Sequence, residues 1–92
     1  MQNILESWKR KMGLSDWQIS IVNISPNQVL YPRDIGKDKY FIGVAQDYNL
    51  KRAVIYHDVE LNEESIVHEL LHIVYPTKSE SWINKKTISL NN

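Results

Sequence analysis

The stretch His68-Glu69-Leu70-Leu71-His72 decides how this chain folds and which chemistry it can carry. Four residues of a helix rise about 6 Å and return to nearly the same face, so both imidazoles can reach one metal ion. Glu69 leans toward the neighbouring face, where its carboxylate can act as a base without binding the metal. Zinc accepts imidazole ligands and, with one coordination position open, activates water near neutral pH. The pattern therefore predicts a helix with a zinc site and hydrolytic chemistry.

The residues around this motif define the ends of its helix. Asn62 suits the N-cap, and Glu63 and Glu64 suit the first turn, where they face the positive end of the helix dipole. Pro76 cannot continue a helix, so the helix is predicted to end soon after Val74. Apolar residues recur at helical spacing between these limits: Ile66, Val67, Leu70, Leu71, Ile73 and Val74. Both histidines are therefore expected in one helix of about twelve residues.

A helix and a half-buried strand are predicted at the start of the chain. Ile4, Leu5, Trp8 and Met12 recur at helical spacing, which predicts a helix over about residues 2–12 with Gly13 as its C-cap and Trp8 in the core. Residues 17–24 alternate apolar and polar side chains, as a strand with one buried face does.

A loop and a hairpin are predicted between this strand and the motif. Residues 25–39 contain Pro26, Pro32 and Gly36 and read as a long loop, with a short strand at 28–31 as an option. Residues 40–47 and 52–57 are rich in β-branched and aromatic side chains, which predicts a β-hairpin.

A second helix is predicted after the motif. Thr77-Lys78-Ser79-Glu80 has the form of a capping box, with Thr77 at the N-cap and Glu80 three residues later. The helix should run to about Ser89. The element order then predicts one α+β domain over residues 1–92: an N-terminal backing helix, a small, mainly antiparallel sheet, the helix with both histidines and a C-terminal helix that begins near Glu80.

A hydrolytic zinc site usually needs a third protein ligand. After His72 the chain has no histidine or aspartate, and Glu80 is its one glutamate, so a downstream ligand must be Glu80. Eight residues can span up to about 26 Å, which is enough to reach the histidines after a chain reversal. His57 and Asp58 are the upstream alternatives. Glu80 also has a structural alternative, because a capping box would place a glutamate at this position without any metal.

The motif followed by Glu80 resembles the gluzincin branch of the zincin metallopeptidases. The chain length, the element order and the segment Glu80-Ser-Trp-Ile-Asn-Lys-Lys-Thr87 are most similar to the minigluzincins, small archaeal members of this branch. The resemblance implies a minimal zincin upper subdomain in which His68, His72 and Glu80 bind zinc and Glu69 is the general base. The position whose aspartate orients a zinc-bound histidine in gluzincins is occupied here by Asn84, which keeps a hydrogen-bond acceptor without the charge.

The same resemblance implies a latent enzyme, or zymogen, whose C-terminal segment blocks its own site or the site of a neighbouring copy. Substrates would be peptides or unfolded proteins, which pair with an edge strand near residues 40–47. Peptide hydrolysis also needs a donor for the developing oxyanion, for which Tyr75 and His57 are candidates. The rival hypothesis is a non-catalytic domain that zinc stabilises for binding a protein partner.

Composition excludes several other classes of function. Eleven basic and eleven acidic residues cancel, so no global charge predicts binding to nucleic acid or to an anionic membrane. The chain has no cysteine and no apolar run of the length of a membrane span. The first twelve residues lack the apolar stretch of a signal peptide. These features predict a cytoplasmic protein that acts neither on nucleic acid nor in a membrane.

Overall fold

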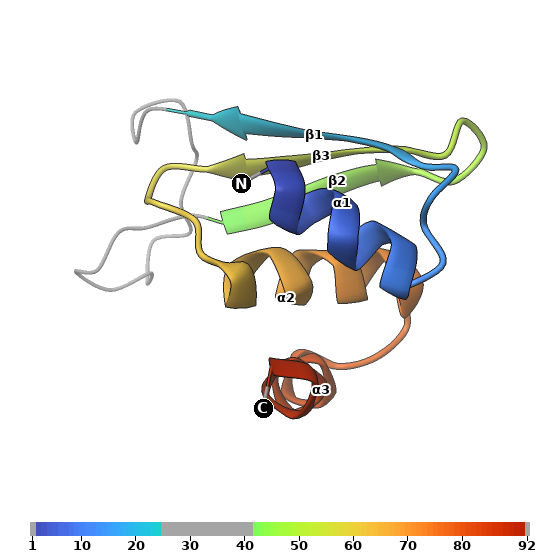
Figure 1. Cartoon of the computed structure of the whole chain (residues 1–92). Helices are drawn as coiled ribbons and strands as arrows, with labels where there is room; N and C mark the ends of the chain where they lie inside the picture. Colours follow the sequence, from blue (N-terminus) through green and yellow to red (C-terminus); the bar gives the residue numbers. More distant parts are fainter. Residues whose placement is uncertain (1, 25–41, 92) are drawn as a thin grey trace, which may run out of the picture.

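The computed structural model describes residues 2–24 and 42–91. In this part of the chain the elements are α1 (Gln2–Lys11), β1 (Gln18–Asn23), β2 (Ile42–Asp47), β3 (Arg52–His57), α2 (Glu63–Val74) and α3 (Glu80–Asn91) (Figure 1). The predicted α+β class and the element order are confirmed. The loop over 25–39, its optional strand at 28–31 and the start of the hairpin at residues 40 and 41 lie outside the described residues.

The sheet is mixed, with strand order β1-β3-β2. β2 pairs antiparallel with β3, as the predicted hairpin requires, and Val44 lies opposite Ile55. β1 pairs parallel with β3, with Ile21 opposite the same Ile55. The expectation of a mainly antiparallel sheet therefore holds for one of the two pairings, because the chain reverses twice between β1 and β3. Among the strands of the described residues, this order leaves β2 at an edge.

Three layers build the domain. α1 and α2 lie on one face of the sheet, and α3 packs against α2 on the side away from the sheet (Figure 1). The predicted alternation of β1 sets its buried face, since Ile19 is buried toward the helices while Gln18 and Ser20 are exposed. The core joins the sheet to α1 and α2 through Leu5, Trp8, Ile19, Ile55, Ile66 and Leu70. Trp8 is therefore a core residue, as predicted.

Gly13 ends α1 as predicted. Its φ of +73° is in the left-handed region that favours glycine. The amide of Leu14 donates to the carbonyl of Lys9 at 2.8 Å, and the amide of Gly13 donates to the carbonyl of Arg10 at 3.3 Å. This pair of bonds is the Schellman motif that satisfies the last carbonyls of a helix.

α2 is held at both ends by side chains from distant elements. At its start, Nε1 of Trp8 donates to the carboxylate of Glu63 at 2.6 Å. At its end, the hydroxyl of Tyr48 donates to the carbonyl of Ile73 at 2.8 Å. The ring of Tyr48 also meets Trp17 edge to face, with centroids 5.3 Å apart. The helix that carries the histidines is thus fixed to α1 and to the hairpin turn.

The caps of the last two helices differ in how well the sequence predicts them. Asn62 caps α2 as expected, because its Oδ1 accepts from the amide of Ser65 at 2.8 Å. For α3, Oγ of Ser79 accepts from the amide of Trp82 at 3.1 Å, and the carbonyl of Ser79 accepts from Ile83. The prediction that Thr77 caps this helix is wrong, because its first turn begins two residues later.

α3 continues to Asn91, slightly beyond the predicted end near Ser89. No helix among residues 2–24 and 42–91 is long and apolar enough to cross a membrane.

Candidate metal centre

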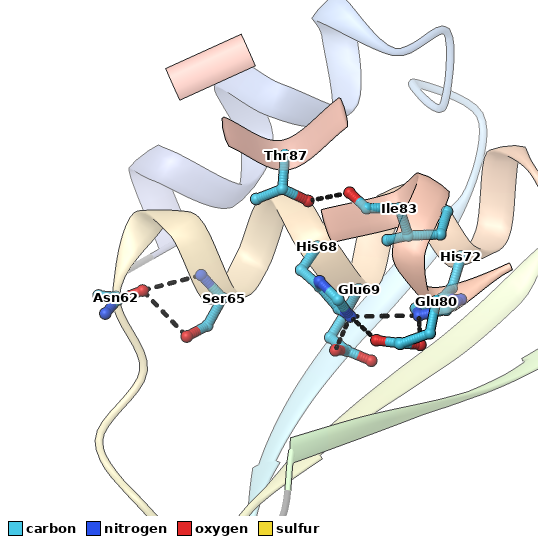
Figure 2. A network of polar contacts seen from close by, with 8 residues as sticks. All are labelled: Asn62, Ser65, His68, Glu69, His72, Glu80, Ile83 and Thr87. Carbon is cyan, nitrogen blue, oxygen red and sulfur yellow. Dashed lines mark hydrogen bonds and ion pairs between the residues drawn. The ribbon is translucent and has the colours of Figure 1, made fainter. Parts of the chain in front are cut away.

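Three side chains from two helices converge at the side of α2 that faces α3 (Figure 2). The Nε2 atoms of His68 and His72 lie 3.2 Å apart. Glu80 places Oε1 2.5 Å from Nε2 of His68 and Oε2 3.0 Å from Nε2 of His72. The i, i+4 spacing thus brings both imidazoles to one point, as the sequence predicted, and the first residue of α3 completes the cluster.

The geometry and the chemistry of this cluster fit zinc. All donor atoms lie within 4.8 Å of one another. Ligand atoms about 2.0–2.2 Å from a tetrahedral zinc ion would be about 3.3–3.5 Å apart. The separations of 3.2 Å and 3.0 Å are close to this range, and the 2.5 Å contact is shorter because imidazole and carboxylate touch directly. Two imidazoles and one carboxylate form a donor set that leaves one zinc position open.

The cap of α3 explains why Glu80 is free to join the histidines. In the predicted capping box, Glu80 would be the third helical residue, with its carboxylate turned back to the amide of Thr77. With Ser79 as the cap, Glu80 is instead the first helical residue. Its side chain remains 62% exposed and contacts both imidazoles. The predicted capping box of Thr77 and Glu80 is therefore wrong, and the ligand role of Glu80 stays a prediction.

Glu69 lies beside the cluster and is not part of it. Its Oε2 is 3.9 Å from Nε2 of His68, farther than any contact of Glu80 with the imidazoles. The side chain of Glu69 is 7% exposed, while those of His68 and His72 are 20% and 26% exposed. Burial, and secondly the negative charge of Glu80, raise the pKa of Glu69 from 4.5 to about 7. A carboxylate with such a pKa can accept and release a proton near neutral pH.

This raised pKa predicts a pH-dependent stability of the metal-free protein. Between pH 4.5 and about 7 the folded state keeps the proton of Glu69 and the unfolded state has lost it, so the unfolding free energy falls as the pH rises. Over this pH interval the unfolding free energy should decrease by about 3 kcal/mol. Urea unfolding in the presence of a chelator, measured across this range, tests it. Glu69→Gln should lack this decrease. An unchanged dependence of the unfolding free energy on pH in the variant would contradict the prediction.

Two clefts meet at the cluster. They share Ile42, His68, Glu69 and Glu80. The larger, about 720 Å³, extends between α2 and α3, and the smaller, about 340 Å³, extends along β2. No lysine or arginine is present among the described residues that line them. The carboxylates of Glu69 and Glu80 therefore favour a cation at the junction of the clefts.

Three other residues that the sequence singled out lie outside both the cluster and the described linings of the clefts. Nδ1 of His57 is 2.7 Å from the carbonyl of Val59, and neither His57 nor Asp58 belongs to the group that can hold a metal. The ring of Tyr75 packs against Trp82, with centroids 4.8 Å apart. Neither His57 nor Tyr75 is among the described residues that line the clefts.

Asn84 is a further residue that the sequence singled out. It lines the larger cleft with His68, Glu69 and Glu80. Within the part of the chain that the structure describes, the hydrogen bonds of the two imidazoles include none with Asn84. Its predicted role in orienting a histidine therefore stays a prediction.

Sequence reasoning missed the residues that shape the clefts. Ile42, Ser65 and Thr87 come from three elements, and none has a chemical signature of its own. The one usable signal for the cleft lining was the spacing of four residues between Glu80, Asn84 and Ile88, which places them on one face of a helix.

Comparison with known proteins identifies no relative. No protein-family model, no curated protein and no solved structure matches this chain. What the site can do therefore follows from its own side chains.

Proposed function

We propose that this protein is a minimal zinc-dependent metallopeptidase of the gluzincin type, close to the minigluzincins, with zinc held by His68, His72 and Glu80. The observation that carries the proposal is the convergence of these three donors beside the buried carboxylate of Glu69, at a junction of two clefts. A structural zinc site would need neither a buried base nor a cleft.

Each side chain of the site has its own role in the proposed hydrolysis. When bound, zinc supplies a Lewis acid that polarises a peptide carbonyl and lowers the pKa of water. Glu69 takes the proton of the attacking water and passes it to the leaving amine, because its carboxylate lies beside the donor cluster, with Oε2 3.9 Å from Nε2 of His68. His68 and His72 are held on one face by α2, whose ends are fixed by Trp8 and Tyr48. The histidines therefore need little reorganisation.

The substrate of this proposal is an extended peptide or an unfolded protein. β2 is an edge strand in the part of the sheet that residues 2–24 and 42–91 form, and the smaller cleft runs past its residues Gly43, Val44 and Gln46. An extended chain that adds to this edge by main-chain hydrogen bonds would pass over the junction of the clefts. Such binding recognises the main chain of the substrate rather than its side chains. We propose no role in nucleic-acid binding, and a cytoplasmic location fits the absence of cysteine.

Latency is part of the proposal. The C-terminal residues continue α3, where Thr87 is buried and Ile88, 55% exposed, lines the larger cleft. These last turns can restrict the cleft of their own chain, or reach the cleft of a second copy in a homo-oligomer. The competing function is a non-catalytic domain in which zinc fastens α3 to α2 and an exposed surface binds a protein. One observation favours this second function: the three donors come from α2 and α3, which pack against each other, so bound zinc would stabilise this packing.

Metal removal tests the proposal. The purified protein should contain about one zinc ion per chain and cleave a fluorescently labelled unfolded casein; a chelator should abolish cleavage, and added zinc should restore it. A chain that ends at Thr87 belongs in the same assay, because latency predicts faster cleavage without Ile88. Zinc binding without cleavage by either chain supports the non-catalytic domain. A protein that takes up no zinc contradicts both.

A further inference from the structure

We infer that Asn84 is a substrate-binding residue, whose side-chain amide donates a hydrogen bond to the peptide carbonyl oxygen under attack at the metal centre. This inference rests on the proposed peptidase function. As the carbonyl carbon becomes tetrahedral, its oxygen gains negative charge, and hydrolases place a hydrogen-bond donor there. Asn84 transfers no proton in this step.

Neither residue suggested by the sequence for this task is in place. The described linings of the two clefts include neither His57 nor Tyr75. Nδ1 of His57 faces the carbonyl of Val59, and the ring of Tyr75 packs on Trp82. The donor must therefore be sought among the polar residues that line the clefts.

Most polar side chains of the larger cleft already have partners or cannot donate. Oγ of Ser65 donates to Oδ1 of Asn62 at 2.9 Å, at the first turn of α2. The hydroxyl of Thr87 donates to the carbonyl of Ile83 at 2.8 Å (Figure 2). Glu64 offers only acceptor oxygens when ionised. Asn62 is six residues before His68 on α2, about 9 Å away along the helix axis.

In the smaller cleft, the side-chain amide of Gln46 already donates to the hydroxyl of Tyr48 at 3.5 Å. Asn84 of the larger cleft remains, and its place suits the role. It follows Glu80 by four residues on α3, so both side chains project from the same face of this helix, about 6 Å apart along its axis. It is exposed and lines the cleft that also contains His68 and Glu69. Its amide carries two N–H donors and no charge. An aspartate at this position would repel the developing oxyanion, whereas an amide can stabilise it.

The experiment compares two substitutions that change different quantities in the two possible roles of Asn84, donor to the substrate or orienter of a histidine. It measures three quantities for wild type, Asn84→Ala and Asn84→Asp: zinc affinity, the kcat of casein-peptide cleavage, and the affinity of the zinc-loaded protein for an alanine tetrapeptide with a phosphonate in place of the central amide. The phosphonate is a tetrahedral anion and needs no turnover. Ser81→Ala is the control, because Ser81 is exposed on the same helix and is not among the residues that line the clefts.

For a substrate donor, Asn84→Ala should lower kcat and phosphonate affinity together, about 10- to 100-fold, and leave zinc affinity within about twofold. Asn84→Asp should lower both further, through charge repulsion. Two results overturn the inference. In the first, Asn84→Ala lowers zinc affinity 10- to 100-fold and leaves phosphonate affinity unchanged, which would show that Asn84 orients a histidine. In the second, Asn84→Asp has the kcat and the phosphonate affinity of wild type. If neither wild type nor the chain that ends at Thr87 cleaves peptide although both bind the phosphonate, the peptidase proposal fails, and the phosphonate affinities of the variants still decide whether Asn84 donates to a tetrahedral anion. If wild type binds no phosphonate, the inference fails as well.

Discussion

Replacing Glu69 by glutamine should lower the kcat of peptide cleavage about 10²- to 10⁴-fold and leave zinc bound, since a positioned general base contributes a factor of this size. The geometry separates the two effects. Glu69 lies 3.9 Å from Nε2 of His68, outside the group of donors formed by the two histidines and Glu80. Glutamine keeps the shape of the side chain and removes its capacity to accept a proton. The variant should therefore fold and bind zinc as wild type does.

The measurement is kcat with a labelled peptide, with zinc content determined on the same samples. Glu64→Gln is the matched control, because it removes the same charge from an exposed position of the same helix and cleft. The control should change kcat only a few-fold. If Glu69→Gln and wild type cleave at equal rates, the buried carboxylate has another role. If neither cleaves, the chain that ends at Thr87 decides: absence of cleavage by that chain with zinc bound favours the non-catalytic domain.

Local signals predicted the helix that carries the histidines and its immediate surroundings. Asn62 and Pro76 mark the ends of α2 in the sequence because a side-chain cap and the loss of an amide act within a few residues. For the same reason Gly13 marks the end of α1. The parallel pairing of β1 with β3 is different, since these strands are more than 25 residues apart and no local pattern specifies which strand pairs with which.

The start of α3 shows where local signals become ambiguous. Thr77 and Ser79 are both good N-cap residues, and Thr77 has the added support of a glutamate three positions later. In the fold, the contact of Glu80 with two imidazoles from α2 competes with that support, and Ser79 becomes the cap. The choice depends on a tertiary contact. The sequence allows Glu80 either to complete a capping box or to contact the histidines. Only the position of α2 relative to α3 decides between these two arrangements.

This contact leads to the second large expected effect. Glu80→Ala should weaken zinc binding at least about 100-fold, because it removes one of three protein ligands from a site whose total binding free energy is of the order of 10 kcal/mol. Competition with a chelator of known zinc affinity measures the loss. Cleavage at limiting zinc should fall by a similar factor. The variant should also move the pKa of Glu69 back toward its ordinary value, since the charge of Glu80 is the second cause of its shift.

Ser79→Ala separates the ligand role of Glu80 from the stability of its helix. This substitution removes the hydroxyl that accepts from the amide of Trp82 and should cost about 1 kcal/mol of helix stability. Because Ser79 does not touch the imidazoles, zinc affinity should fall far less than in Glu80→Ala. Comparable losses of zinc affinity in the two variants would mean that the site depends on an ordered α3 rather than on the carboxylate itself. Glu80→Gln refines the comparison, since it keeps an oxygen donor near both imidazoles but removes the charge that favours the cation.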